Sequence, residues 1–208
     1  TWSVWRHQRL AFCESCFFLG IIVICVMLII SFKKNNSIHK ARISILSLVF
    51  YYYLCVMLTK IVGIPTLKEY IRLSRLGESF FNPNINLIPF SNGFSFGFIL
   101  SIFLFIPLGF LCPLISKKYQ HIKNTLFIGC GLSFTIEIVQ LFTLYRATDI
   151  DDLITNIIGT LLGYLCFKIA HKLIAKKSHP LSDFQEPCYI QYIPIAIIAI
   201  TFIFGFFS

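Results

Sequence analysis

The chain contains a run without a single charged side chain that extends from Ser79 to Ser116. A transmembrane helix needs about 20 mainly apolar residues, so this run is longer than one span requires. Its first half carries Pro, Asn and Gly at close intervals, and these residues mark turns. The run therefore predicts an irregular segment followed by one membrane-spanning helix over about residues 94–115. A chain built around such a segment folds in lipid rather than in water.

The composition agrees with a membrane protein. Hydrophobic residues make up 57% of the 208 residues and charged residues only 13%, against about 25% charged in a typical soluble domain. These values exclude an intrinsically disordered protein and argue against a soluble enzyme. The net charge of +9 does not indicate a nucleic-acid partner, because the Lys and Arg residues lie in short clusters between apolar segments, as in cytoplasmic loops of membrane proteins.

The apolar segments predict an all-α polytopic membrane protein, a bundle of five to six transmembrane helices. We expect the spans at about residues 15–32, 43–64, 94–115, 125–144, 150–167 and 193–208. The start at Thr1 and the short sixth segment leave open whether both termini are complete. We expect three regions: two helices and an outer loop in residues 1–84, a three-helix core in residues 85–167, and a basic cytoplasmic loop with the last helix in residues 168–208.

The distribution of Lys and Arg predicts the orientation. Alternate loops, at residues 33–42, 117–123 and 168–177, carry clustered basic residues and should be cytoplasmic. The loops at residues 65–93 and 145–149 are then outside. In the first of these, Lys68, Arg72 and Arg75 could form a basic amphipathic helix on the outer surface, either simply solvated or in contact with phosphate head groups.

Glu137 is an acidic residue near the middle of the fourth predicted span. A charged side chain at the bilayer centre costs roughly 3 kcal/mol on insertion scales. Ser133, Glu137 and Gln140 are spaced four and three residues apart and share one helix face, which should therefore face the bundle interior. Glu137 either holds helices together by hydrogen bonds or serves a functional site.

A second polar stripe opens the fifth predicted span. Asp149 is well placed as an N-cap, with Asp152 three residues further on. Asp152, Asn156, Gly159 and Gly163 then follow at intervals of four, three and four, so that they line one helix face. The glycines form a GxxxG pattern, which lets another helix approach closely. We expect this face to pack on the fourth span as a tight antiparallel pair.

The two stripes should meet at the same depth in the membrane. Glu137, Gln140, Asp152 and Asn156 would then form one polar pocket open to the outer face, with Arg146 in the connection as the counter-charge. Intramembrane ionisable residues are functional candidates by default. A divalent cation is also conceivable, although no recognised metal motif is present; the candidate ligands are Asp149, Asp151 and Asp152.

Three blocks of sequence resemble the VanZ-like family of bacterial membrane proteins over about residues 85–167. They are Asn86-Leu-Ile-Pro-Phe90, Phe105-Ile-Pro-Leu-Gly109, and the series from Leu132 to Gln140, Ala147 to Asp152 and Asn156 to Gly163. The positions that match the family pattern are Asn86, Pro89, Phe90, Pro107, Gly109, Glu137, Gln140, Asp149, Asp152, Asn156, Gly159 and Gly163. Ser101 departs from it, because the pattern leads us to expect Asn there.

The resemblance implies roles for these residues. Binding roles fall to Asn86, Ser101, Gln140, Asp149 and Asn156, and structural roles to Pro89, Phe90, Pro107, Gly109, Gly159 and Gly163. It also implies the cytoplasmic membrane of a Gram-positive bacterium. The founding member of the family is associated with lowered susceptibility to teicoplanin and related lipoglycopeptides, without altered peptidoglycan precursors.

Several functions remain open on the sequence alone. The leading hypothesis is a protein that acts at the outer leaflet on a lipid-linked or lipid-tailed molecule, such as a membrane lipid, a cell-wall precursor or a lipoglycopeptide. The enzyme alternative is a lipid-directed hydrolase or transferase, with Glu137 or Asp152 as general base and Arg146 stabilising negative charge. A small proton-coupled transporter, in which a dimer would supply the missing bulk, and a structural partner of another membrane protein are further alternatives.

Overall fold

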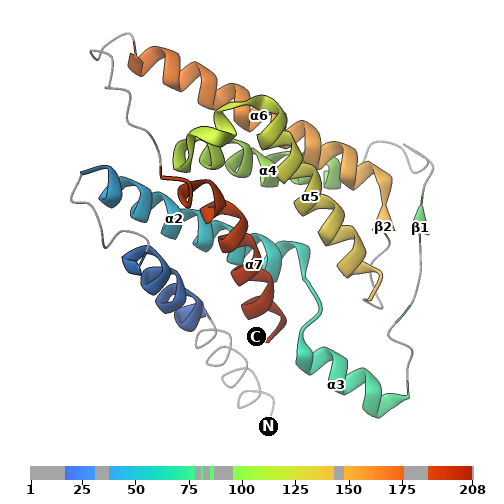
Figure 1. Cartoon of the computed structure of the whole chain (residues 1–208). Coiled ribbons are helices and arrows are strands. Elements are labelled where there is room, and N and C mark those ends of the chain that lie inside the picture. The colour runs from blue at the N-terminus through green and yellow to red at the C-terminus, as the bar shows by residue number, and fades with distance from the viewer. Residues whose placement is uncertain are drawn as a thin grey trace. The chain divides into compact units, whose positions relative to one another are not determined.

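The computed structural model describes residues 17–30, 38–77, 81, 85–86, 96–142, 148–175 and 187–207 (Figure 1). Four of its helical segments are long and apolar enough to cross a membrane: Lys40–Leu76, Phe96–Ile115, Ile122–Gln140 and Ile150–Ile174. Two shorter apolar helices span Phe17–Ile30 and Ile190–Phe206. The predicted all-α membrane fold is confirmed, and the chain is a membrane protein.

The chain divides into two compact units. The first comprises Thr1–Asn82, Phe142–Tyr145 and Ala196–Ser208, and the second comprises Pro83–Leu141 and Arg146–Ile195. The three regions expected from the sequence, with boundaries after residues 84 and 167, stay a prediction about the organisation of the chain.

The first unit is built around α2 (Ile38–Val56), which continues into the π-helical segment η1 (Met57–Val62). The helix Phe17–Ile30 packs on α2 where Gly20 meets Tyr51, because a Cβ added at Gly20 would overlap the Tyr51 hydroxyl. That hydroxyl donates a hydrogen bond to the carbonyl of Phe17 at 3.3 Å. The second predicted span is therefore present, and it ends where Gly63 adopts a left-handed conformation with φ of 69°.

A short helix, α3 (Leu67–Leu76), follows four residues after η1. Thr66 caps its N-terminus by accepting a hydrogen bond from the backbone N–H of Glu69 at 3.4 Å. Gly77 ends it in the left-handed region, with φ of 69°. Leu73 is buried, and α3 is therefore the amphipathic helix that the basic spacing predicts. The last helix, α7 (Ile193–Phe206), reaches the first unit with Gly205 against Ile64.

The second unit contains three long helices: α4 (Phe96–Ile115), α5 (Ile122–Gln140) and α6 (Ile150–Ala175). Two short strands, β1 (Ile85–Asn86) and β2 (Thr148–Asp149), pair in parallel, with Ile85 opposite Thr148 and Asn86 opposite Asp149. Since β1 precedes α4 and β2 leads directly into α6, the pair ties together the chain segments that enter these two helices (Figure 1).

The α4 and α6 helices are parallel and lie in backbone contact. A Cβ added at Gly159 would overlap the carbonyl oxygen of Ile102, and one added at Gly163 would overlap that of Ile106. The contact is reciprocal, because a Cβ at Gly109 would overlap the carbonyl oxygen of Thr160. The expectation that the GxxxG face packs on the fourth span is therefore wrong: the two glycines face α4, the third predicted span.

The α5 helix runs antiparallel to α6, as predicted for these two spans. Gly129 faces the Thr160 side chain, and Ser133 bonds Asn156, so residue numbers rise along one helix as they fall along the other. The α5 helix ends at Gln140, earlier than expected, whereas α6 continues past residue 167 to Ala175. The ammonium of Lys168 lies 5.6 Å from the Tyr164 ring centroid, in keeping with a helix that continues to the membrane surface.

The opposite end of the second unit is tied by tyrosine side chains. The hydroxyl of Tyr164 donates to the carbonyl of Gln120 at 2.7 Å, and that of Tyr119 donates to the carbonyl of Gln191 at 2.7 Å. Tyr119 lies in the 3-10 turn η2 (Lys117–Gln120) between α4 and α5. Burial, together with Cys112 and Tyr192 nearby, raises the pKa of Tyr119 to about 12.

Large apolar side chains cover the outside of the helices. Phe96 is 79% exposed and Phe127 is 80% exposed. Such exposure of aromatic groups would be unfavourable in water, and it is expected where helices face lipid acyl chains. Polar residues of the second unit are correspondingly gathered inside, and that gathering defines the candidate site.

Candidate functional site

The candidate site lies where α5 ends and α6 begins, beside the paired strands β1 and β2. Its centre is Glu137, whose side chain is 6% exposed. One carboxylate oxygen, Oε2, accepts a hydrogen bond from the backbone N–H of Asp149 at 3.2 Å. Ser133 and Gln140 are buried on the same face of α5, so the inward face predicted from their spacing is present.

Asp149 links the strands to the start of α6. Its Oδ1 accepts a hydrogen bond from the backbone N–H of Asp151 at 3.0 Å, as an N-cap does. Its Oδ2 accepts from the side-chain amide of Asn86 at 3.4 Å. The predicted N-cap is confirmed, and the same carboxylate also joins two segments that are far apart in the sequence. Negative charge at this position is favoured by the dipole of α6.

Asp152 and Asn156 belong to the same stripe but contact different helices. The hydroxyl of Ser101, on α4, donates to Oδ1 of Asp152 at 3.3 Å. The amide of Asn156 donates to the hydroxyl of Ser133, on α5, at 2.8 Å. The polar stripe of α6 therefore lies in the wedge between α4 and α5, which explains why its glycines and its amide have different neighbours.

The structure brings together most of the predicted site residues, and three of them lie outside the residues that it describes. Asn86, Glu137 and Asp149 form one connected set, because Asp149 accepts from Asn86 through its carboxylate and donates to Glu137 through its backbone N–H. Ser101 with Asp152, and Ser133 with Asn156, make separate links from α6 to its neighbours. The predicted counter-charge Arg146, together with Pro89 and Phe90, lies outside the described residues.

Two contributors to the site did not follow from the sequence. The pairing of β1 with β2 was not expected, because strands of two residues leave no periodic pattern to detect. The partner of Glu137 is a backbone N–H, and a backbone group cannot be recognised from the type of residue that carries it. Ser133, in contrast, could have been added to the site residues from its position one turn before Glu137 on the same helix face.

Prolines and small residues shape the frame around the site. Pro107 and Pro113 lie within α4, where each removes one helix hydrogen bond. Thr155 and Thr160 turn their hydroxyls back to the α6 backbone: Thr155 donates to the carbonyl of Asp151 at 2.8 Å, and Thr160 to that of Asn156 at 2.9 Å. These buried hydroxyls are satisfied within α6 and leave the carboxylate and amide groups to link the helices.

A family model described as VanZ/LLP1 matches residues 16–171. The chain belongs to the VanZ/LLP1 family. The matched range contains every residue of the hydrogen-bonded set, from Asn86 to Asn156, and the helices that hold it. The resemblance drawn from the sequence motifs is thus confirmed and extends towards the N-terminus beyond the motifs themselves.

One relative within the family is Protein VanZ of Enterococcus faecium. It is 33% identical over 95 residues, which cover 45% of this chain and 58% of that protein. The match thus spans less than two thirds of the relative's length. No solved structure matches this chain.

Metal binding finds no support in the geometry of this VanZ/LLP1 protein. Within the described ranges, no three His, Cys, Asp or Glu side chains converge in the way that metal ligands do. Of the three candidate ligands, Asp149 is engaged with Asn86 and with the N-terminus of α6, and Asp152 is engaged with Ser101. We therefore derive no chemistry through a divalent cation.

The site can act as a hydrogen-bonding surface that combines acidic and amide groups. Carboxylates of Glu137, Asp149 and Asp152 accept hydrogen bonds, and the amides of Asn86 and Asn156 both donate and accept. A buried carboxylate can also take up a proton, which leaves acid–base chemistry open.

Proposed function

We propose that this VanZ/LLP1 family protein acts at the outer leaflet of the bacterial cell membrane on a lipid-linked or lipid-tailed molecule. The observation that carries the proposal is the burial of the Glu137 carboxylate within a membrane-spanning helix. This carboxylate accepts a hydrogen bond from the backbone N–H of Asp149. Burying an acid in a membrane protein is costly, and a purely structural link could use a neutral Gln or Asn.

The orientation follows from the charges of the loops. Lys117 and Lys118 lie in η2 and Lys123 in the first turn of α5, at the end of the second unit opposite to Asp149. Under the positive-inside rule this end is cytoplasmic. The carboxylate cluster, which comprises Glu137, Asp149 and Asp152, then belongs at the outer face. There it lies on the side of the membrane that molecules in the outer leaflet reach without crossing the bilayer.

The chemistry of the cluster favours a ligand with two parts. An acyl or prenyl tail would lie in lipid against the apolar outer surfaces of the helices, while a hydroxyl- or amide-rich head would exchange hydrogen bonds with Glu137, Asp149 and Asn86. Cell-wall precursors, teichoic-type lipids and lipoglycopeptide antibiotics share this construction. Binding such a molecule at the outer face would lower the access of a glycopeptide to its target.

The resemblance to the VanZ-like family supports lowered susceptibility to teicoplanin as the cellular consequence, in a Gram-positive host. Resistance by masking or sequestration requires binding alone. It therefore needs the geometry of the cluster but no turnover.

Acid–base catalysis on the same ligand is the second candidate, and the burial of Glu137 favours it. In a hydrolase, Glu137 would accept the proton of the attacking water while the water oxygen forms the new bond to the acyl or phosphoryl centre. The bond between that centre and the leaving group would then break, and the leaving group would take the proton back from the carboxylic acid. An amide at position 137 cannot accept that proton, so the Glu137→Gln variant distinguishes acid–base catalysis from binding alone.

The test measures teicoplanin susceptibility in a sensitive Gram-positive host that expresses the wild-type chain or one variant at equal membrane levels. Glu137→Gln and Asp152→Asn remove one charge each from the cluster. Glu186→Gln and Asp183→Asn make the same chemical changes elsewhere in the chain. We expect wild type and both control variants to lower susceptibility, and both cluster variants to lose most of the effect.

The outcomes separate the readings. Resistance that survives Glu137→Gln and Asp152→Asn unchanged would refute a role for the cluster. Partial loss supports binding, since amides preserve part of the hydrogen bonding, whereas complete loss with Glu137→Gln supports acid–base chemistry. If the well-inserted wild-type chain has no effect on susceptibility, the proposed resistance function is wrong for this protein.

A further inference from the structure

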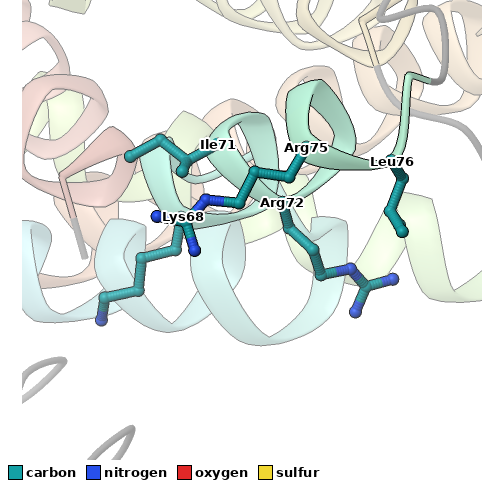
Figure 2. A pocket seen from close by; sticks show the side chains of 5 residues that line it. All are labelled: Lys68, Ile71, Arg72, Arg75 and Leu76. Carbon is teal, nitrogen blue, oxygen red and sulfur yellow. The ribbon is translucent and has the colours of Figure 1, made fainter.

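A second polar feature lies outside the carboxylate cluster, on α3 of the first unit. Lys68, Arg72 and Arg75 follow one another at intervals of four and three residues, so they share one face of this helix. Figure 2 shows the Lys68 and Arg72 side chains extending from the same side of α3, with Ile71 and Leu76 on either flank. These five residues line a shallow hollow of about 370 Å³.

The chain itself places α3 at the membrane boundary. The membrane-spanning segment α2–η1 ends at Val62, and only residues 63–66 separate it from the start of α3. Four residues span at most about 14 Å when extended, and the polar head-group layer begins where the hydrocarbon ends. The start of α3 therefore lies within reach of the head-group layer, on the same side as the end of that span.

The two faces of α3 differ in a way that fits an interfacial helix. Leu73 is 3% exposed, so one side of the helix is covered. Ile71 lies on the side of α3 opposite to Leu73 and is exposed, and Tyr70 and Leu76 are exposed on the two flanks. Amphipathic or apolar groups of this kind settle at the membrane–water interface. The basic residues lie between Ile71 and Leu76, so cations and apolar groups meet the boundary together.

The charge of this face is positive after Glu69, the acid within α3, is counted. Glu69 forms an ion pair with Arg72, with 3.8 Å between a guanidinium nitrogen and a carboxylate oxygen. Three cations against one carboxylate leave an excess of positive charge. Arginine presents a planar fork of donors that matches two phosphate oxygens, and lysine adds a point charge.

We propose that α3 binds the phosphate of anionic phospholipid head groups through Lys68, Arg72 and Arg75. Ile71 and Leu76 contact the upper acyl chain of the same lipid. This lipid site is separate from the carboxylate cluster. Binding there fixes the rotation and depth of α3 at the bilayer surface.

The test titrates the detergent-solubilised full-length chain with phosphatidylglycerol or phosphatidylcholine and measures the dissociation constant of the first bound lipid by native mass spectrometry. We expect wild type to bind phosphatidylglycerol at least about fivefold more tightly, the factor that one surface cation contributes to binding of an anionic membrane. The triple variant Lys68→Gln, Arg72→Gln, Arg75→Gln should lose this preference.

A matched control removes the same charge elsewhere. Lys40→Gln, Arg42→Gln and Lys117→Gln together leave α3 intact, and this control should keep the preference for phosphatidylglycerol. If the triple variant does not fold, the single variants Arg72→Gln and Arg75→Gln replace it, because both positions are exposed. Each should weaken phosphatidylglycerol binding and leave phosphatidylcholine binding unchanged.

Any of three results of the lipid titration would overturn the proposal. They are an equal affinity of wild type for the two lipids, a preference for phosphatidylglycerol that survives in the α3 variants, and a preference for phosphatidylglycerol that is lost equally in the control. Inorganic phosphate distinguishes a free anion from a head group: if it displaces phosphatidylglycerol completely at a concentration equal to that of the lipid, the face binds phosphate as such and not a lipid.

Discussion

The α6 helix makes two contacts of opposite character, one with α4 and one with α5. Towards α4 it presents Gly159 and Gly163, and the two backbones touch. Towards α5 it presents Asn156, which donates a hydrogen bond to Ser133. Asp149 of β2, directly before α6, donates its backbone N–H to Glu137. One contact therefore depends on shape and the other on polar pairing, although both involve the same helix.

The difference teaches what each contact can tolerate. Backbone contact between helices allows no extra atom, because backbone atoms cannot rotate away as the end of a side chain can. Hydrogen bonds between helices tolerate exchange of one donor or acceptor for another of similar size. We infer that the α4 side holds the frame of the unit rigid, while the α5 side can change its chemistry without loss of the fold.

The largest expected effect comes from Gly163→Ala on the α4 side. The added Cβ would overlap the carbonyl oxygen of Ile106, and we expect a loss of about 1–3 kcal/mol or more in the free energy of unfolding. Thermal unfolding of the purified protein in detergent measures it. Gly131→Ala on α5 is the matched control, because nothing lies within 4 Å of its added Cβ. Equal stability of the two variants would contradict the close contact.

Removal of the Glu137 side chain should have the next largest effect. Glu137→Ala leaves the backbone N–H of Asp149 without its carboxylate partner, which costs about 1–3 kcal/mol for a buried donor. Glu137→Gln keeps an oxygen acceptor of the same length and should cost less. The two variants are compared by the same thermal unfolding measurement. A Glu137→Gln protein as unstable as Glu137→Ala would mean that the charge, and not the acceptor, stabilises this link.

Asp149→Ala should destabilise α6 at its first turn. The loss of an N-cap costs about 1 kcal/mol, and here the same change also removes the acceptor for Asn86. Asp149→Asn should restore most of the stability, since Asn caps helices about as well as Asp. Amide hydrogen exchange over residues 150–154 reports the fraying directly. Unchanged exchange in Asp149→Ala would argue against the cap.

The smallest effect should come from the pair Ser133 and Asn156. A double-mutant cycle with Ser133→Ala and Asn156→Ala isolates their coupling, and interhelical hydrogen bonds in membranes average about 0.6 kcal/mol. Unfolding in detergent of the wild type, the two single variants and the double variant provides the four free energies. A coupling near zero would show that the α5 side, too, is held by shape rather than by polar pairing.

The sequence predicted the helices well because the length and polarity of a membrane span are fixed by the bilayer. Each apolar segment of sufficient length became a helix, and the N-cap at Asp149 followed from residue type. The inward face of α5 followed from the spacing of Ser133, Glu137 and Gln140. These features are local, so each can be inferred from residues within a few turns of one another.

The neighbours of each face were harder to predict. Periodicity shows that Asn156, Gly159 and Gly163 share a face, but not which helix that face contacts. The stripe is wide enough to contact two helices. The prediction that pairs the whole stripe with α5 is therefore wrong for the glycines, which pack on α4. The partners of Glu137 and Asn86 depend on a strand pair that joins residues 63 positions apart, which no local pattern encodes.

The hydrogen bond between Glu137 and the backbone of Asp149 also sets an order of events during synthesis. Glu137 leaves the ribosome 12 residues before its partner, a delay of about 0.6 to 2.4 seconds at elongation rates of about 5–20 residues per second. A lone acid is poorly retained in the bilayer during that interval. We therefore expect α5 and α6 to enter the membrane together as one hairpin, with the acid of the first helix satisfied only once the second has begun to form.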